Sequence, residues 1–105
     1  MTITIYGIKA CDTCRKTLKE IEGAVLHDVR DTPLSRAQLE VFYVLFGEKL
    51  LNTRSSTWRG LSEQDRQFPL IQLLLEHPTL MKRPVIVSEA QTTIGWDAAA
   101  KAVWL

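Results

Sequence analysis

Residues 2–26 read TITIYGIKACDTCRKTLKEIEGAVL, and this stretch decides the fold. Ile3 and Ile5 alternate with threonines at the period of two that is typical of a β-strand. A helix is predicted from about 12 to 22, because apolar side chains recur there at i, i+4 and i+7. The apolar run from 24 to 26 indicates a second strand. Two strands joined through a helix are expected to pair in parallel, so the sequence predicts a β-α-β unit.

The middle of the chain is predicted to be a helical insertion over about 34–80. Ser35 and Gln38 have the spacing of a capping box at a helix start. Residues 50–60, LLNTRSSTWRG, are rich in polar turn formers and indicate a loop or a short helical turn. Residues 70–77 are apolar at nearly every position and predict a helix buried on most sides.

The last part of the chain is predicted to be a β-hairpin followed by a helix. The β-branched run 85–87 and the segment 92–94 are separated by a connection short enough for antiparallel pairing. Asp97 is a natural N-cap for an alanine-rich helix over 98–104. The order β-α-β, helices, β-β-α predicts an α/β chain with a mixed, four-stranded sheet whose faces are covered by helices.

Composition narrows the class of protein. The chain has 105 residues, 46% of them hydrophobic, so one domain spanning 1–105 with a single core is expected. Thirteen basic and twelve acidic residues give a net charge of +1, which argues against nucleic acid as a direct partner. No apolar run approaches the roughly 20 residues of a membrane span, and the first residues lack signal-peptide features. A cytoplasmic protein is expected, where cysteines stay mostly reduced.

The motif Cys11-Asp12-Thr13-Cys14 carries the strongest chemical signal, because it lies between a strand and a helix of a β-α-β unit. The first-turn amides and the helix dipole favour a thiolate at Cys11, which would make it a nucleophile. Cys14 falls on the apolar face of the helix and within disulfide reach, as a resolving cysteine requires. The alternative is that both are ordinary small apolar residues.

Zinc binding is a rival interpretation of the same cysteines. Cys11, Cys14 and His27 begin like a zinc-finger spacing, but His77 comes 49 intervening residues later. Such sites place the second histidine three to five residues after the first. No metal is therefore expected.

Three arginines and one proline form a second candidate cluster. Arg54 and Arg59 flank the polar loop around Trp58, which could form a site wall, and Arg83 precedes Pro84 at a strand start. A guanidinium pairs well with an oxyanion and also favours a nearby thiolate. A proline at the start of a strand next to a redox motif is a position where a cis peptide is useful. Surface arginines that are merely solvated are the alternative.

Three segments, YGIKACDTCRKTLK, LLNTRSSTWRGL and EHPTLMKRPVIV, resemble the arsenate-reductase-like (ArsC) family, which includes the Spx and YffB proteins. The resemblance spans nearly the whole chain and is strongest to YffB-like members. It implies a thioredoxin-like fold with a helical insertion between β-α-β and β-β-α halves. By resemblance, Cys11 matches the nucleophile, Arg54 the middle-motif arginine, and Arg83 with Pro84 the arginine and cis-proline facing that cysteine. In the arsenate reductases the arginines help to hold an oxyanion, and glutathione or glutaredoxin supplies electrons.

Departures from the family pattern shape the functional hypothesis. Trp96 occupies the region where arsenate reductases carry a third arginine, which argues against arsenate reduction. Those enzymes also have a lone active-site cysteine, whereas Cys14 supplies a partner, as in Spx. Spx proteins usually continue beyond the last helix, but this sequence stops at Leu105. The expected function is a cytosolic thiol-disulfide oxidoreductase that uses glutathione as a co-substrate and acts on a small oxyanion or disulfide. The alternative is an Spx-like redox-sensing regulator that binds the α subunit of RNA polymerase.

Overall fold

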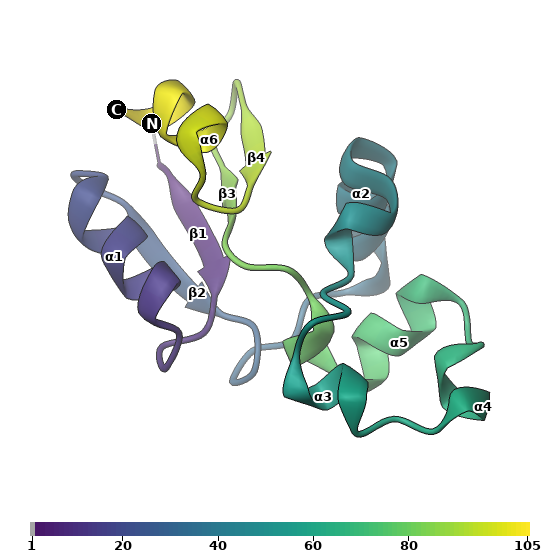
Figure 1. The fold of residues 1–105 in the computed structure, drawn as a ribbon. Helices are drawn as coiled ribbons and strands as arrows, with labels where there is room; N and C mark the ends of the chain where they lie inside the picture. The colour runs from purple at the N-terminus through teal and green to yellow at the C-terminus, as the bar shows by residue number, and fades with distance from the viewer. Residues whose placement is uncertain (1) are drawn as a thin grey trace. The chain divides into compact units, whose positions relative to one another are not determined.

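The computed structural model describes residues 2–105 (Figure 1). The chain divides into two compact units. The first contains the described residues up to Thr32 together with Arg83–Leu105, and the second is Pro33–Lys82. Among the described residues, no helix has the length and apolar character of a membrane span.

The first unit is built on a four-stranded mixed sheet. Its strands are β1 (Thr4–Gly7), β2 (Val25–Asp28), β3 (Val85–Val87) and β4 (Thr92–Ile94), in the order β2-β1-β3-β4. β1 pairs with β2 in parallel and with β3 antiparallel, and β3 and β4 form the antiparallel hairpin. These pairings confirm the predicted α/β fold class.

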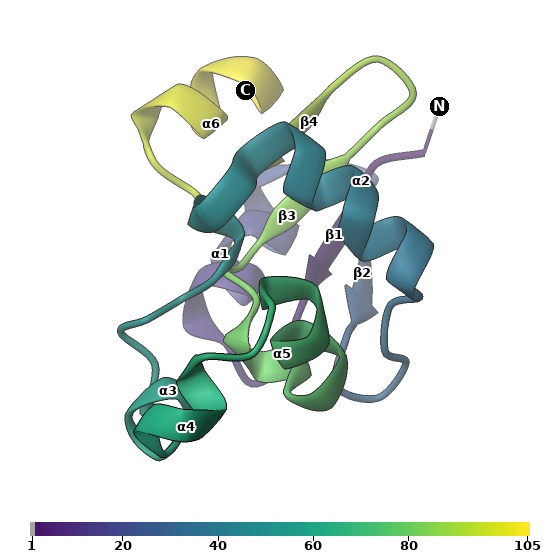
Figure 2. The ribbon, with the colours of Figure 1, turned by 90° about the vertical axis from the view of Figure 1, so that its right-hand side faces the viewer.

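Two helices, α1 (Asp12–Glu20) and α6 (Ala98–Trp104), lie on the same face of this sheet (Figures 1 and 2). The strand registers align one row of side chains across it: Leu26, Ile5, Ile86 and Thr93. Three buried residues, Ile5, Ile21 and Ile86, form the core cluster of the sheet. Leu18 of α1 and Trp104 of α6 pack against it, and the Trp104 indole N–H donates to the Thr93 hydroxyl at 2.7 Å. Asp97 caps α6 as predicted, accepting the Ala100 N–H.

Helix α1 ends at Glu20, two residues before the predicted boundary. Ile21 already has extended backbone angles, and its side chain is buried in the core cluster of the sheet. Gly23 then takes a φ of +80°, a left-handed conformation that favours glycine, in the turn between α1 and β2. The helix therefore ends at the residue before the one that enters the core.

The second unit is helical. Its elements are α2 (Arg36–Phe46), η1 (Gly47–Leu50), α3 (Ser56–Arg59), α4 (Glu63–Arg66), α5 (Leu70–Glu76) and η2 (Pro78–Leu80). The predicted capping box is present: the Ser35 hydroxyl accepts the Gln38 N–H, and the Gln38 side chain accepts the Ser35 N–H. The prediction that α5 is buried on most sides is wrong, because only Leu73 and Leu74 are buried. The other residues of α5 are partly open to solvent, with Leu70, Ile71, Gln72 and Leu75 half-buried and Glu76 exposed.

Candidate redox site

Cys11 is the N-cap residue of α1 and is partly exposed. Its N–H donates to the Ile8 carbonyl at 3.0 Å, and its own carbonyl accepts the first helical N–H, that of Arg15, at 3.0 Å. Cys14, one turn further along, is fully buried. No disulfide joins the two thiols. The strand–CxxC–helix arrangement therefore has one accessible and one enclosed sulfur, as the sequence predicted.

The surroundings of Cys11 favour its thiolate. Burial acts to raise its pKa, but three nearby groups together outweigh that effect and hold the pKa below the ordinary value of a cysteine thiol. They are the backbone N–H of Cys14, the Cys14 thiol, and the side chain of Arg83, which contributes both a hydrogen bond and a positive charge. First-turn amides were expected to act in this way.

Cys14 has the opposite chemistry. Burial, together with a hydrogen bond and the charge of the adjacent Cys11 sulfur, raises the pKa of its thiol to about 12. A hydrogen bond from the backbone of Ile8 and the charge of Arg83 act the other way, without overcoming burial. The pKa values of two cysteines three residues apart are therefore shifted in opposite directions, and only Cys11 has its thiolate favoured.

Gly7, the last residue of β1, makes room for Cys14. A Cβ built on Gly7 would lie 2.4 Å from the Cys14 sulfur, closer than the 3.0 Å that Cβ atoms essentially never pass. The sequence alone identifies Gly7 only as the end of a strand. A glycine within a strand often marks a site that another group approaches closely. The glycine at this position was therefore the signal for the contact with Cys14.

Arg83 reaches the cysteines because of strand pairing. Tyr6 of β1 faces Val85 of β3 in an antiparallel register, so the residue two positions before Val85 lies beside the loop that follows β1. The Arg83–Pro84 peptide bond is cis, and Pro84 is fully buried. Three of the predicted site residues, Cys11, Cys14 and Arg83, thus lie together in the first unit, with Pro84 next to them in the chain.

Arg54 lies in the second unit, in a turn before α3. Its side chain is exposed, and its backbone N–H donates to the Asn52 side chain at 3.0 Å. Its contribution to an anion site stays a prediction. Trp58, considered as a site wall, is instead covered by Arg66, whose guanidinium lies 5.2 Å from the ring centroid and also donates to the Trp58 carbonyl.

Trp96 points toward the far end of α1 from the cysteines. Its indole N–H donates to the carboxylate of Glu20, the last residue of α1, and the Lys101 ammonium lies 5.9 Å from the ring centroid. Its ring also packs against the core cluster. In this chain, Trp96 therefore anchors the β4–α6 connection and lines no part of the cysteine site.

Asp28, at the end of β2, was not singled out from the sequence. Its carboxylate is buried and accepts three backbone N–H groups, from Lys9, Arg30 and Asp31. Burial acts to raise its pKa, but these three bonds and the charge of Lys9 outweigh burial and lower the pKa below 3.8. An acidic residue at the end of a short strand, followed directly by the apolar Val29, was the available signal.

The histidines considered as metal ligands make other contacts. His27 pairs through Nε2 with the Thr32 carbonyl at 2.8 Å and lies against the Tyr6 ring. His77 is the C-cap residue of α5. Within residues 2–105, no three His, Cys, Asp or Glu side chains form a group that could hold a metal ion.

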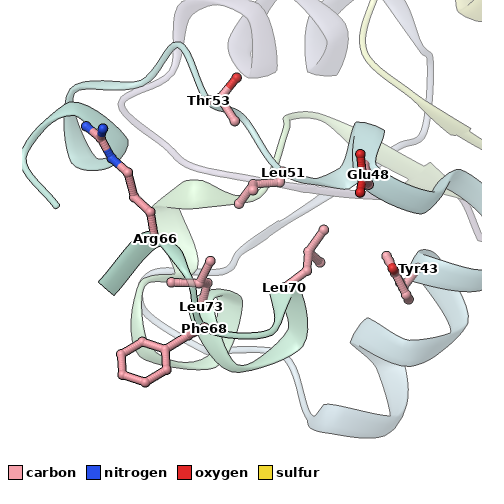
Figure 3. Close-up of a pocket in the computed structure, with 8 residues that line it drawn as sticks. All are labelled: Tyr43, Glu48, Leu51, Thr53, Arg66, Phe68, Leu70 and Leu73. Carbon is pink, nitrogen blue, oxygen red and sulfur yellow. The ribbon is translucent and has the colours of Figure 1, made fainter. Parts of the chain in front are cut away.

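A pocket of about 480 Å³ lies within the second unit (Figure 3). Its lining comprises Tyr43, Glu48, Leu51, Thr53, Arg66, Phe68, Leu70 and Leu73. The lining contains no cysteine, and its only basic side chain, Arg66, is already bonded to the Trp58 carbonyl. This pocket is distinct from the cysteine site.

The fold and the cysteine pair define a thioredoxin-like α/β protein. The family model described as the ArsC family matches residues 6–102, and the chain belongs to this family. A solved structure of a YffB protein aligns with a TM-score of 0.87 at 31% identity, covering 98% of each chain. An uncharacterized protein of Haemophilus influenzae is 41% identical over 105 residues, covering 90% of this chain and 91% of the relative. The regulatory protein MgsR of Bacillus subtilis is 34% identical over 106 residues, covering 90% and 83%.

Proposed function

We propose that this protein is a cytoplasmic thiol-disulfide oxidoreductase in which Cys11 is the nucleophile, Cys14 resolves, and glutathione is the co-substrate. The observation that carries this proposal is the opposite acidity of the two cysteines. The pKa of Cys11 is lowered beside Arg83, whereas burial raises the pKa of Cys14 to about 12. A nucleophile whose thiolate is favoured by its surroundings, next to a partner thiol that stays protonated, is the starting state of a dithiol exchange cycle.

The first step is attack by the Cys11 thiolate on a mixed disulfide between glutathione and a substrate thiol. The S–S bond of the mixed disulfide breaks, a bond forms between Cys11 and one of its sulfurs, and the other sulfur leaves as a thiolate that takes a proton. Cys14 then attacks the Cys11 sulfur and releases the second thiol, leaving a Cys11–Cys14 disulfide. Two further glutathiones restore the dithiol and form glutathione disulfide, which balances the two electrons.

The order of these steps follows from the coupling between the two sulfurs. Cys14 is held protonated first by burial and then by its hydrogen bond and charge interaction with Cys11. Once Cys11 is part of a mixed disulfide it carries no charge, so its share of the pKa rise at Cys14 disappears. Cys14 then loses its proton more easily, at the stage where its attack is needed.

Arginines supply the anion-binding part of the proposal. Glutathione carries carboxylates, and a guanidinium binds a carboxylate in a bidentate manner. Arg83 is beside Cys11, and Arg54 is proposed to complete the wall by resemblance to the family's middle motif. A small oxyanion would use the same two groups. Arsenate itself is not proposed as the substrate, because Trp96 stands in the region of the third family arginine.

Turnover of a glutathione mixed disulfide by the wild-type protein and by Cys14→Ser tests the proposal. We expect glutathione-dependent turnover by the wild type, loss of that turnover in Cys14→Ser, and trapping of a Cys11 mixed disulfide that mass spectrometry detects. Full activity of Cys14→Ser would refute the dithiol cycle and indicate a monothiol mechanism that uses Cys11 alone. Absence of activity in the wild type would refute the enzymatic proposal.

Regulation is the second candidate function, and the similarity to MgsR, a regulatory protein, favours it. In that case the Cys11–Cys14 pair would sense disulfide stress, and the partner would be the α subunit of RNA polymerase, as in Spx. Binding of the oxidised and the dithiol protein to the purified C-terminal domain of the polymerase α chain tests this alternative. Redox-dependent binding without glutathione turnover would favour the regulator, and turnover without binding would favour the enzyme.

A further inference from the structure

We propose that Asp28 is a positioning residue that fixes the loop between β1 and α1, and thereby places Cys11 at the helix start. This inference rests on the proposed function, because it concerns the same cysteine site. Asp28 makes no contact with a cysteine in the bonds described above, so it acts through the loop.

The carboxylate of Asp28 divides its bonds between two segments. One oxygen, Oδ2, accepts the Lys9 N–H at 2.8 Å, and this bond joins the end of β2 to the loop after β1. The other, Oδ1, accepts the N–H groups of Arg30 and Asp31 at 2.8 and 3.1 Å. With only 8% of the residue exposed, water competes weakly for these bonds, and bonds to an ionised acceptor are the strong ones.

Lys9 follows Ile8, whose backbone forms hydrogen bonds to both cysteines. The Ile8 carbonyl accepts the Cys11 N–H at 3.0 Å, and the Ile8 backbone also hydrogen-bonds the Cys14 sulfur. Asp28 therefore fixes Lys9, and through Ile8 the loop fixes the position of Cys11 relative to the Cys14 N–H and to Arg83. Those two groups lower the pKa of Cys11. A loosened loop moves Cys11 away from them, so their effect on its pKa becomes smaller.

The sign of the effect separates positioning from simple electrostatics. Removing the negative charge of Asp28 would, through space alone, make the Cys11 thiolate easier to form. Loss of loop geometry does the reverse, because it takes the thiolate away from its donors. A purely structural role of Asp28 would lower stability and leave the titration of the folded protein unchanged.

Alkylation of Cys11 by iodoacetamide, followed as a function of pH, tests the inference in Asp28→Asn and in the control Asp31→Asn. Asparagine keeps one acceptor oxygen but places an amide donor where the second oxygen was, so one of the two segments is released. Asp31→Asn removes the same charge three residues further along, in the turn after β2, but only breaks an exposed ion pair with the Lys9 side chain. We expect the midpoint of the pH profile of alkylation to rise in Asp28→Asn, with alkylation at pH 7 slower by about three- to tenfold. In Asp31→Asn we expect the midpoint to stay unchanged.

The outcomes distinguish this inference from the proposed function. A wild-type midpoint at or above that of free cysteine, roughly 8.5, would refute the proposed function whatever Asp28 does. A low wild-type midpoint that is unchanged or lowered in Asp28→Asn would overturn the positioning role alone. Amide hydrogen exchange in the wild type decides the matter if Asp28→Asn does not fold: the Lys9 N–H must be protected, and free exchange there would equally overturn the inference.

Discussion

Replacing Gly7 with alanine tests the close approach of β1 and α1 that shapes the cysteine site. The added Cβ would lie 2.4 Å from the Cys14 sulfur and 3.2 Å from the Cys14 Cβ. Cys14 is fully buried, so its sulfur cannot swing into solvent, and α1 must shift or the side chain must strain. Overpacking of this kind costs about 1–3 kcal/mol. For a chain of this size each kcal/mol lowers the melting temperature by about 4–8 °C.

Urea unfolding measures this cost in four variants: Gly7→Ala, Gly60→Ala, Cys14→Ala and the double variant Gly7→Ala/Cys14→Ala. Gly60→Ala is the matched control, because its Cβ would meet the Ser56 and Thr57 carbonyls at ordinary distances of 3.5 and 3.6 Å and its φ is −80°. We expect Gly60→Ala to change the free energy of unfolding by no more than about 0.5 kcal/mol. Cys14→Ala removes the clashing sulfur, so in that background the cost of Gly7→Ala should fall below about 1 kcal/mol.

Two results would refute this reasoning. The first is a Gly7→Ala cost no larger than that of Gly60→Ala. The second is a Gly7→Ala cost that is the same with and without the Cys14 sulfur. Either would mean that β1 and α1 are not packed through these two residues.

Three further predictions concern Arg83, Ser35 and Asp28. Arg83→Gln should raise the pKa of Cys11, because it replaces the charged guanidinium donor with a shorter, neutral amide, and should slow alkylation at pH 7; pH profiles identical to the wild type would contradict the assigned role. Ser35→Ala should lower the free energy of unfolding by about 0.5–2 kcal/mol through loss of the capping box, and an unchanged urea midpoint would show that the cap is dispensable. Asp28 has a lower pKa folded than its ordinary value of 3.8, so its ionised form stabilises the fold above that value and this contribution is lost as the pH falls through the folded pKa. The stability difference between wild type and Asp28→Asn should therefore shrink in acid, and a difference independent of pH would be inconsistent with this origin.

Local features of the fold were predictable from sequence. The capping box at Ser35, the N-cap at Asp97 and the hairpin after Pro84 depend on residues close together in the chain, and each is present. The CxxC motif also placed Cys11 at a helix start and Cys14 on its buried face for local reasons, since three residues nearly complete one helical turn.

Features that depend on contacts between distant segments were not predictable in the same way. The packing of Gly7 on Cys14 requires knowledge of how α1 crosses β1, and the bond from Lys9 to Asp28 spans 19 residues. Trp96 matched a family position by sequence, yet its bond to Glu20, 76 residues away, directs it to the opposite end of α1 from the cysteines. Local propensity carries no information on such pairings.

Titration of the two thiols by their thiolate absorbance is the most direct test of the central claim that Cys11 is activated and Cys14 is not. In wild-type protein we expect one thiol to ionise below the value of free cysteine, roughly 8.5, and the other to ionise with a pKa of about 12. Cys11→Ser should abolish the low transition, and Cys14→Ser should retain a single thiol that ionises at or below 8.5. Two thiols that ionise together near 8.5 would contradict the claim.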